Sequence, residues 1–163
     1  MTAERLSLIG QIEALPELVA AEVEFAPDAQ LDTVYKQGGW TVRQVVHHLA
    51  DSHMNAFIRM RLILTEDHPT LKPYQQDDWA RFEDSSKGPV ATSLAILRGV
   101  HARWATMLRL LPDSAWLRTG YHPENGTVSI DGLLHSYAEH GLNHLKHIRT
   151  GLSNAKARLA VGA

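Results

Sequence analysis

The sequence predicts an all-α fold, a four-helix bundle with a small hairpin before the last helix. Four long segments repeat apolar residues at the spacing of one helix face. The breaks between these segments contain proline, glycine or a helix-capping pattern, which end and restart helices. A third observation is the pair Asn125-Gly126, the strongest short signal for a hairpin turn, inside residues 119–130. At 163 residues the chain suits one domain, which we place at 1–163.

The first helix is predicted over residues 3–23. Its apolar positions follow helix spacing: Leu6, Ile9, Ile12, Leu15, Val19 and Val23. Pro16 lies inside this pattern and has no N–H to donate, so we expect the helix to be kinked or split there. Residues 25–40, with one proline and a Gly-Gly pair, are predicted to form a loop.

The second helix is predicted to begin after Thr41 and to run to about Glu66. Thr41 and Gln44 have the spacing of a capping box, in which each side chain bonds the backbone N–H of the other residue. A long polar crossover, 67–89, follows. Within it, residues 75–83 are predicted to form a short helix. Crossovers of this length are usually structured or functional.

The third and fourth helices complete the predicted bundle. The third covers about 90–111 and ends before a proline. The fourth is expected to be capped by Ser129 or Asp131 and to end near Gly151, a residue type favoured just past a helix end. The remaining segment, 152–163, is predicted to be a short helix or a tail.

Composition excludes several classes of protein and of site. Hydrophobic residues make up 44% of the chain, the net charge is -2, and no basic stripe is visible, which argues against a nucleic-acid partner. No apolar run approaches the ~20 residues of a membrane span. The N-terminus lacks the pattern of a signal peptide, so we expect a cytoplasmic protein. Without cysteine, any metal must be held by His, Asp or Glu.

One cluster of histidines lies on the predicted fourth helix. His140, His144 and His147 are spaced i, i+4 and i+7, which places them on one helix face. Neutral imidazole is the commonest protein ligand for transition metals. Spacing alone does not decide between His140 with His144 and His144 with His147 as the ligand pair. The alternative is that these are polar residues on a half-solvated face.

A second cluster lies on the second helix. His47 and His48 are adjacent, so their side chains differ by about 100° and cannot easily face one ion. His53 lies nearer the apolar stripe, where a hydrogen-bonded core residue is the more common outcome. His48 lies at the edge of the stripe. Asp51, one turn further on, either fixes the tautomer of His48 or is a solvated carboxylate.

The other histidines are interpreted as loop or surface residues: His68, His101, His122 and His135. His122 is the exception, because it lies in the hairpin and could reach a neighbouring site. Trp40 directly precedes the capping box, where an apolar residue can staple the start of a helix. The other tryptophans are interpreted as core or loop anchors: Trp79, Trp104 and Trp116.

These motifs resemble those of a known family. The stretch from Gly38 to Asn55, which contains Trp40, the capping box and His47-His48-Leu49, resembles the YfiT branch of the DinB/YfiT-like proteins. The resemblance covers most of the chain beyond about residue 30. It continues through further stretches: 64–66, 72–74, Trp79, 101–104, 121–123 and the fourth-helix histidines.

The resemblance implies a four-helix bundle in which three histidines hold one divalent metal ion per subunit. Carried over by motif, these ligands are His48, followed by an aliphatic residue, and His140 with His144. Three imidazoles favour Zn²⁺, or Ni²⁺, over Mg²⁺ or Ca²⁺. The branch also resembles homodimers, so we expect one here.

The activity implied by the resemblance is that of a metal-dependent hydrolase acting on a small-molecule substrate. Other members of the superfamily resemble thiol S-transferases that use a low-molecular-weight thiol such as bacillithiol or mycothiol. A third interpretation is a non-catalytic metal-binding stress protein.

No residue stands out as the general base. The candidates are Asp51, Glu139 and His122. Glu139 stands where the family pattern has an aromatic residue, and Leu142 and Asn143 replace a more histidine-rich run. The substrate pocket is therefore expected to differ from that of the family pattern.

Overall fold

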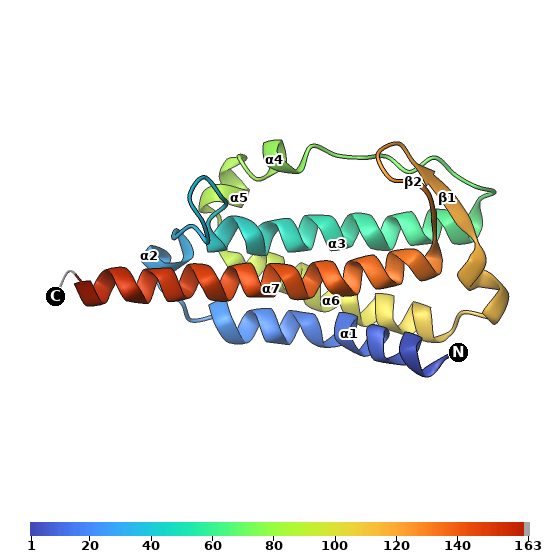
Figure 1. Ribbon diagram of the computed structural model, residues 1–163, viewed down its shortest axis with the longest axis horizontal. Coiled ribbons are helices and arrows are strands. Elements are labelled where there is room, and N and C mark those ends of the chain that lie inside the picture. The colour runs from blue at the N-terminus through green and yellow to red at the C-terminus, as the bar shows by residue number, and fades with distance from the viewer. Residues whose placement is uncertain (162–163) are drawn as a thin grey trace.

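Four long helices lie side by side in the computed structural model, which describes residues 1–161 (Figure 1). They are α1 (Ala3–Val23), α3 (Val42–Thr65), α6 (Val90–Arg109) and α7 (Ile130–Val161). Both α1 and α3 pack against α6 and α7, so α1 and α3 occupy diagonal corners. The predicted bundle is confirmed, including the adjacency of the second and fourth long helices.

Helix α1 continues through Pro16 without a break, so the predicted split there is wrong. The carbonyl of Ile12 loses its usual helical donor because Pro16, four residues on, has no N–H. In this fold that carbonyl accepts a hydrogen bond from Nδ1 of His101 on α6 instead. The freed backbone group is therefore satisfied from a neighbouring helix, and α1 remains one helix.

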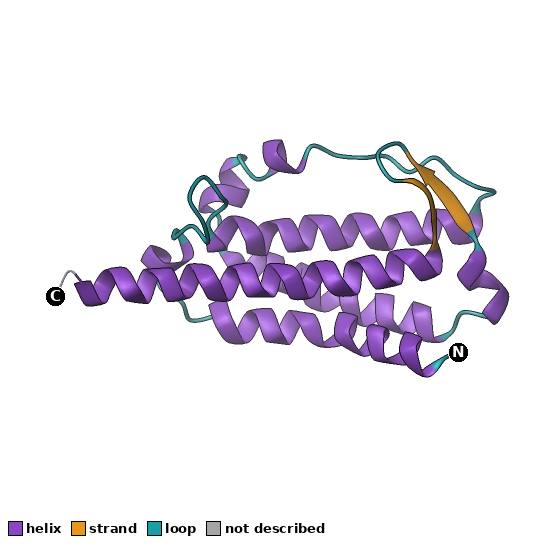
Figure 2. Cartoon of the chain, viewed as in Figure 1, coloured by secondary structure: helices purple, strands orange, loops and turns teal. Residues whose placement is uncertain are grey.

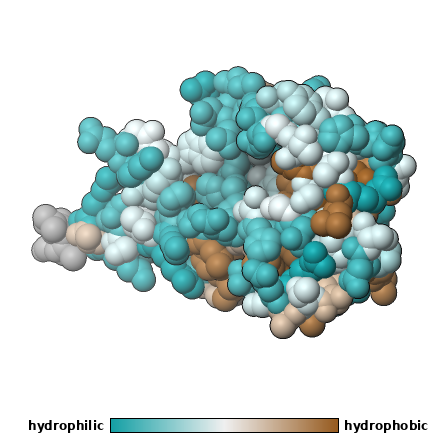
Figure 3. Space-filling view, turned by 45° about the vertical axis from the view of Figure 1, so that its right-hand side comes forward, coloured by the Kyte–Doolittle hydropathy of each residue, from teal (hydrophilic) through white to brown (hydrophobic). Residues whose placement is uncertain are grey.

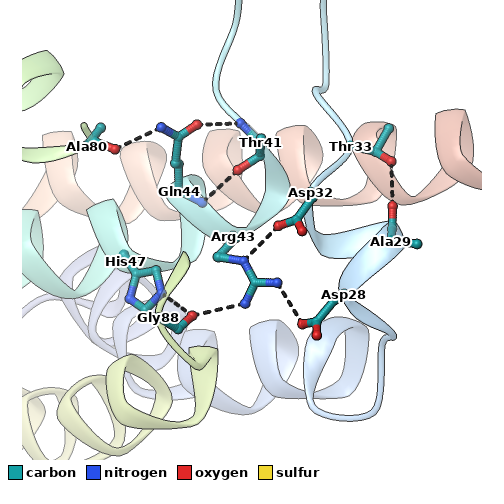
Figure 4. Close-up of polar contacts among 10 residues, drawn as sticks. All are labelled: Asp28, Ala29, Asp32, Thr33, Thr41, Arg43, Gln44, His47, Ala80 and Gly88. Atoms are coloured by element: carbon teal, nitrogen blue, oxygen red, sulfur yellow. Dashed lines mark hydrogen bonds and ion pairs between the residues drawn. The ribbon is translucent and has the colours of Figure 1, made fainter. Parts of the chain in front are cut away.

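Helix α3 begins at the predicted capping box. The N–H of Gln44 donates to Oγ1 of Thr41 at 3.2 Å, and the N–H of Thr41 donates to Oε1 of Gln44 at 2.9 Å. The preceding segment was predicted to be a loop, but it contains a short helix, α2 (Asp28–Leu31). Arg43 of α3 donates to Asp28 of this helix at 2.7 Å and so ties it to the start of α3 (Figure 4).

The crossover returns along α3, so that α6 begins at the same end of the bundle as α3 (Figure 1). It contains two short helices, α4 (Gln76–Trp79) and α5 (Glu83–Lys87), where the sequence predicted one. Within the crossover, the ring of Trp79 lies 4.5 Å from that of Tyr74 and tilts against it.

A 3₁₀ helix, η1 (Asp113–Leu117), leads into the hairpin of β1 (Thr119–His122) and β2 (Gly126–Ser129) (Figure 2). The strands are antiparallel, as predicted. Gly126 takes a φ of +72°, the left-handed region that glycine adopts most easily. The crossover joins this hairpin, because the N–H of Leu71 donates to the carbonyl of Tyr121 at 2.7 Å.

Ser129 caps α7, because its Oγ accepts from the N–H of Gly132 at 3.0 Å. The alternative cap, Asp131, instead forms an ion pair with Arg5 at 2.6 Å. These contacts resolve the two capping alternatives that the sequence left open.

The predicted end of the fourth helix near Gly151 is wrong, because α7 continues to Val161. A Cβ on Gly151 would lie 2.4 Å from Cγ2 of Val42. Glycine therefore permits close approach of α7 to the start of α3 and does not terminate the helix. Of the predicted segment 152–163, residues 162–163 lie outside the described part of the chain.

The apolar core is divided into two clusters. One contains residues from the C-terminal half of α1 and the first two turns of α3, and the other lies towards the hairpin. Between them is a waist at residues 51–55 of α3 and 139–144 of α7, which belongs to neither cluster. The face of the molecule shown in Figure 3 is mostly hydrophilic, with hydrophobic residues in separate patches. No helix of residues 1–161 is long and apolar enough to cross a bilayer.

Candidate metal centre

Three histidines converge at the waist: His140 and His144 lie within it on α7, and His48 lies about one turn before it on α3. His48 of α3 and His140 and His144 of α7 each offer one ring nitrogen, and these nitrogens all lie within 4.8 Å of one another. Nε2 of His48 lies 3.3 Å from Nε2 of His140. Two ligands of a tetrahedral ion, each about 2.0–2.1 Å from the metal, are separated by about the same distance. The donor atoms therefore fit a single transition-metal ion.

The three imidazoles are held in the neutral form that a metal ligand requires. Burial, with the neighbouring His140, lowers the pKa of His48 to about 3. Burial, with His147 beside it, lowers the pKa of His140 to about 4. Burial and the charges of the neighbouring histidines lower the pKa of His144 to about 2. At neutral pH each ring has one nitrogen lone pair free to bind a cation.

Beneath this trio, a chain of hydrogen bonds connects His140 to the far side of the bundle. Nδ1 of His140 lies 3.0 Å from Nε2 of His53. Nδ1 of His53 lies 2.9 Å from Nε2 of His101. Nδ1 of His101 bonds the carbonyl of Ile12. The chain thus runs from α7 through α3 and α6 to α1.

This chain admits one arrangement of protons when its rings are neutral. The carbonyl of Ile12 can only accept, so Nδ1 of His101 carries a proton, and its Nε2 is an acceptor. Nδ1 of His53 must then donate, and its Nε2 accepts from Nδ1 of His140. Burial lowers the pKa of both His53 and His101, which keeps these two rings neutral. It follows that Nε2 of His140 presents its lone pair towards His48.

The adjacent histidines have other partners. His47 turns away from the trio, and its Nδ1 lies 2.8 Å from Oγ of Ser93. His147 stacks on the ring of Tyr35 with centroids 4.2 Å apart and lies outside the converging group. The i, i+4 pair of α7 therefore faces His48, a choice that helix spacing had left open. Trp40 packs against His48 at 4.7 Å between ring centroids, beyond its expected role at the helix start.

Comparison with known proteins identifies the family. The family model described as the DinB superfamily matches residues 11–148, most of the chain. The chain belongs to the DinB superfamily. A protein of Oceanobacillus iheyensis named "Putative metal-dependent hydrolase OB0782" is 48% identical over 86% of this chain and 81% of the relative. "Putative metal-dependent hydrolase YfiT" of Bacillus subtilis is 44% identical over 84% of this chain and 78% of the relative.

A solved structure extends the similarity to the fold. YfiT from Bacillus subtilis superposes with a TM-score of 0.89 and 40% sequence identity, covering 98% of this chain and 90% of that one. It is described as a probable metal-dependent hydrolase with an unusual four-helix bundle topology.

Two clefts reach the trio from different sides. One, of about 560 Å³, is lined by His140 together with Arg59, Tyr74, His122 and Tyr137. The other, of about 420 Å³, is lined by His140 and His144 with residues of the loop before α3. Gln76 and Asp77, at the start of α4, line both clefts. The waist is therefore open to small molecules, although its histidines are largely buried.

The three candidate bases fall in different places. Asp51 forms no hydrogen bond with His48, so it does not fix that tautomer; burial and the charge of Asp84 raise the pKa of Asp51 to about 6. Glu139 is exposed and lines neither cleft. His122 lines the larger cleft beside His140.

Two histidines interpreted as loop or surface residues are buried. His101 is 1% exposed and His122 is 5% exposed, so the surface interpretation is wrong for both. His101 is buried because it serves the carbonyl freed by Pro16. That proline in the middle of a long helix was the signal in the sequence that could have indicated a buried donor. For Arg59 and Tyr137, which also line the cleft, helix spacing gave no such signal.

Proposed function

We propose that this DinB protein is a metal-dependent hydrolase in which His48, His140 and His144 hold one divalent ion. The observation that carries the proposal is the convergence of three neutral ring nitrogens at a waist that two clefts reach. Zinc is our first choice and nickel the second, because borderline ions prefer imidazole to oxygen donors. When bound, such an ion activates water as a nucleophile near neutral pH.

The residues around the trio orient His140 and supply a hydrogen-bond donor to substrate. The hydrogen-bond chain holds His140 with its Nε2 lone pair outward. The backbone N–H of Glu124 donates to Nδ1 of His122 at 3.3 Å, so neutral His122 carries its proton on Nε2. Burial and the nearby charge of Arg59 lower the pKa of His122, which favours this neutral form. We therefore assign His122 as a hydrogen-bond donor to substrate through Nε2, and not as the general base.

Metal analysis of the protein, produced without an affinity tag, tests the ion. We expect one equivalent of zinc or nickel per chain. Hydrolysis of an ester and amide panel by the metal-loaded protein tests the activity, with the metal-free protein as control. Absence of turnover with stoichiometric metal would contradict the hydrolase proposal and favour a non-catalytic metal-binding protein.

Thiol S-transfer is the second candidate function, and the existence of two clefts favours it. A transferase needs room for an electrophile and for a thiol, which must be a co-substrate because the chain contains no cysteine. The same three ligands would serve it, since a bound divalent ion stabilises a thiolate. A screen with an electrophile and bacillithiol separates the candidates. Turnover that requires the thiol would replace the hydrolase assignment.

We also propose that the protein is a cytoplasmic homodimer, supported by its resemblance to the YfiT branch. Light scattering at micromolar concentration is the test of the dimer, with about twice the 18.1 kDa chain mass expected. A mass equal to that of one chain would contradict it.

A further inference from the structure

Arg59 is a buried positive charge without a counter-ion. The residue is 8% exposed, and among the described residues no carboxylate lies within ion-pair distance of it. Its Nη1 donates to the hydroxyl of Tyr137 at 3.1 Å, and its Nη2 donates to the carbonyl of Lys72 at 2.7 Å. Its buried Nε has no acceptor. Both bonds use neutral partners, and the ring of Tyr74, whose centroid lies 5.9 Å from Cζ of Arg59, is uncharged as well, so no anion balances the charge.

Arg43 shows how this fold treats a buried arginine with a structural role. It is 4% exposed and lies earlier on the same helix. Its guanidinium donates to Asp28 at 2.7 Å, to Asp32 at 2.8 Å and to the carbonyl of Gly88 at 2.9 Å (Figure 4). Two carboxylates thus balance its charge. Arg59, equally inaccessible, has none.

An unpaired buried charge is costly, because water is removed without a compensating ion. A protein can retain such a charge at a place where a bound anion balances it. Arg59 lines the larger cleft beside His140, so a molecule in that cleft can reach both. The unbalanced charge of Arg59 and a cleft with room for an anion therefore occur at the same place.

The other groups of the cleft leave Arg59 as its single cation among the described lining residues. Burial raises the pKa of Tyr74 to about 12, so this phenol stays neutral. Burial and the charge of Arg59 lower the pKa of His122. The two carboxylates of the cleft, Asp77 and Glu124, belong to exposed residues and form no ion pair with Arg59.

We propose that Arg59 binds a carboxylate of the substrate. The protein would then act on small esters or amides that carry a carboxylate group at a distance from the bond presented to the histidine trio. The planar guanidinium matches a carboxylate with two parallel hydrogen bonds. This inference rests on the proposed function, because it assigns a substrate class to the same cleft.

Charge-selective binding tests the inference without requiring hydrolysis. The probes are succinate and its uncharged analogue succinamide, titrated calorimetrically into full-length protein supplied with zinc. We expect Arg59→Gln to weaken succinate binding by about tenfold or more and to leave succinamide binding unchanged. Any contact of succinate with zinc is common to both proteins, so the difference reports Arg59.

Arg61→Gln is the matched control, since it removes an exposed charge two residues away and should leave succinate binding unchanged. Thermal denaturation establishes that both variants are folded. Arg59→Lys, which keeps the charge but not the fork, should bind succinate with intermediate affinity. Equal succinate affinity in wild type and Arg59→Gln would overturn the proposal, as would an equal loss for both probes.

A kinetic comparison separates this inference from the proposed activity. Arg59→Gln should lower kcat/KM for 4-nitrophenyl hydrogen succinate more than for 4-nitrophenyl acetate. An equal loss for both esters would assign Arg59 to the transition state and overturn the substrate-carboxylate role. Charge-selective binding without hydrolysis of either ester would sustain the anion site and count against the hydrolase proposal.

Discussion

Two layers of histidines meet at the waist of the bundle, and they differ in how their nitrogens are used. In the inner layer, His53 and His101 have both ring nitrogens bonded within the protein. In the outer layer, Nε2 of His48 and Nε2 of His140 face each other at 3.3 Å. The inner nitrogens are arranged as donor and acceptor in turn, whereas the outer ones converge. The inner layer thus satisfies the hydrogen-bonding groups of its own rings and the carbonyl of Ile12, whereas the outer layer presents nitrogen lone pairs that can bind a cation.

The difference teaches that the role of each histidine depends on whether both of its ring nitrogens are hydrogen-bonded within the protein or one keeps a free lone pair. His140 belongs to both layers, because its Nδ1 donates inward and its Nε2 points outward. The direction of every proton in the chain is set by the carbonyl of Ile12, which can only accept. A proposed metal ligand on α7, His140, is therefore oriented by a proline on α1 through the side chains of two intervening histidines.

Removal of an outer histidine should have the largest effect. His144→Ala deletes one of three proposed donors, so we expect loss of stoichiometric zinc. The fall in zinc affinity should exceed the loss of about 10–100-fold that is typical when a residue hydrogen-bonded to a ligand is removed. Isothermal titration measures it. His135→Ala, an exposed histidine on the same helix, is the control and should bind as wild type. Full retention of zinc by His144→Ala would show that the ligand set is wrong.

Removal of an inner histidine should have a smaller but clear effect. His53→Phe leaves Nδ1 of His140 without its acceptor, and we expect zinc affinity to fall by about 10–100-fold. His47→Phe is the matched control, because His47 is also buried and hydrogen-bonded but faces away from the trio. If the two variants lose zinc affinity equally, the effect of His53 is general destabilisation and not orientation of His140.

Acidification should destabilise the metal-free protein. The folded-state pKa values of His48, His140 and His144 lie at about 3, 4 and 2, below the unfolded value of about 6.5. The unfolded chain therefore binds protons that the folded chain does not. The free energy of unfolding therefore has its full value above about pH 6.5. Below that pH it falls by about 1.4 kcal/mol per pH unit for each such histidine.

Urea denaturation between pH 7.5 and pH 4.5 measures this fall. Circular dichroism should first show that removal of the metal with a chelator leaves the helices intact, since the two apolar clusters do not depend on the ion. A free energy of unfolding that stays constant across this range would contradict the buried, neutral state of the trio.

The smallest effect concerns the start of the chain of hydrogen bonds. His101→Phe leaves the carbonyl of Ile12 without a donor, which costs about 1–3 kcal/mol. Pro16→Ala restores a backbone N–H four residues along α1. His101→Phe should therefore cost less in the Pro16→Ala background, with a coupling of about 0.5–3 kcal/mol in a double-mutant cycle. Additive effects would show that Pro16 does not free the carbonyl for His101.

Local sequence patterns predicted the fold well, because helix caps, turns and apolar helix faces depend on residues that are close together in the chain. The capping box at Thr41 and the Asn125-Gly126 turn occur as predicted, and apolar spacing located all four long helices. Gly151 was misinterpreted because a glycine at a helix end and a glycine at a close helix contact look alike in sequence. Only the position of Val42 distinguishes them.

The site was predictable only in part, because it depends on contacts between residues that are far apart in the sequence. Spacing identified the face of α7 but not whether His140 or His147 pairs with His144, and the motif supplied that choice. His101 was assigned to the surface because its acceptor, Ile12, lies 89 residues away. Arg59 has the helix spacing of an ordinary core-edge residue. Its missing carboxylate becomes visible only when all its neighbours are known.

Nitrogen-15 spectra of the imidazole rings during a zinc titration test the two-layer account most directly. We expect His53, His101 and His140 to carry their protons on Nδ1 before zinc is added. One equivalent of zinc should then shift one ring nitrogen of each outer histidine, His48, His140 and His144, and Nε2 in the case of His140. The protons of His53 and His101 should stay in place. Protonation of His53 on Nε2, or direct zinc binding by an inner histidine, would contradict the account.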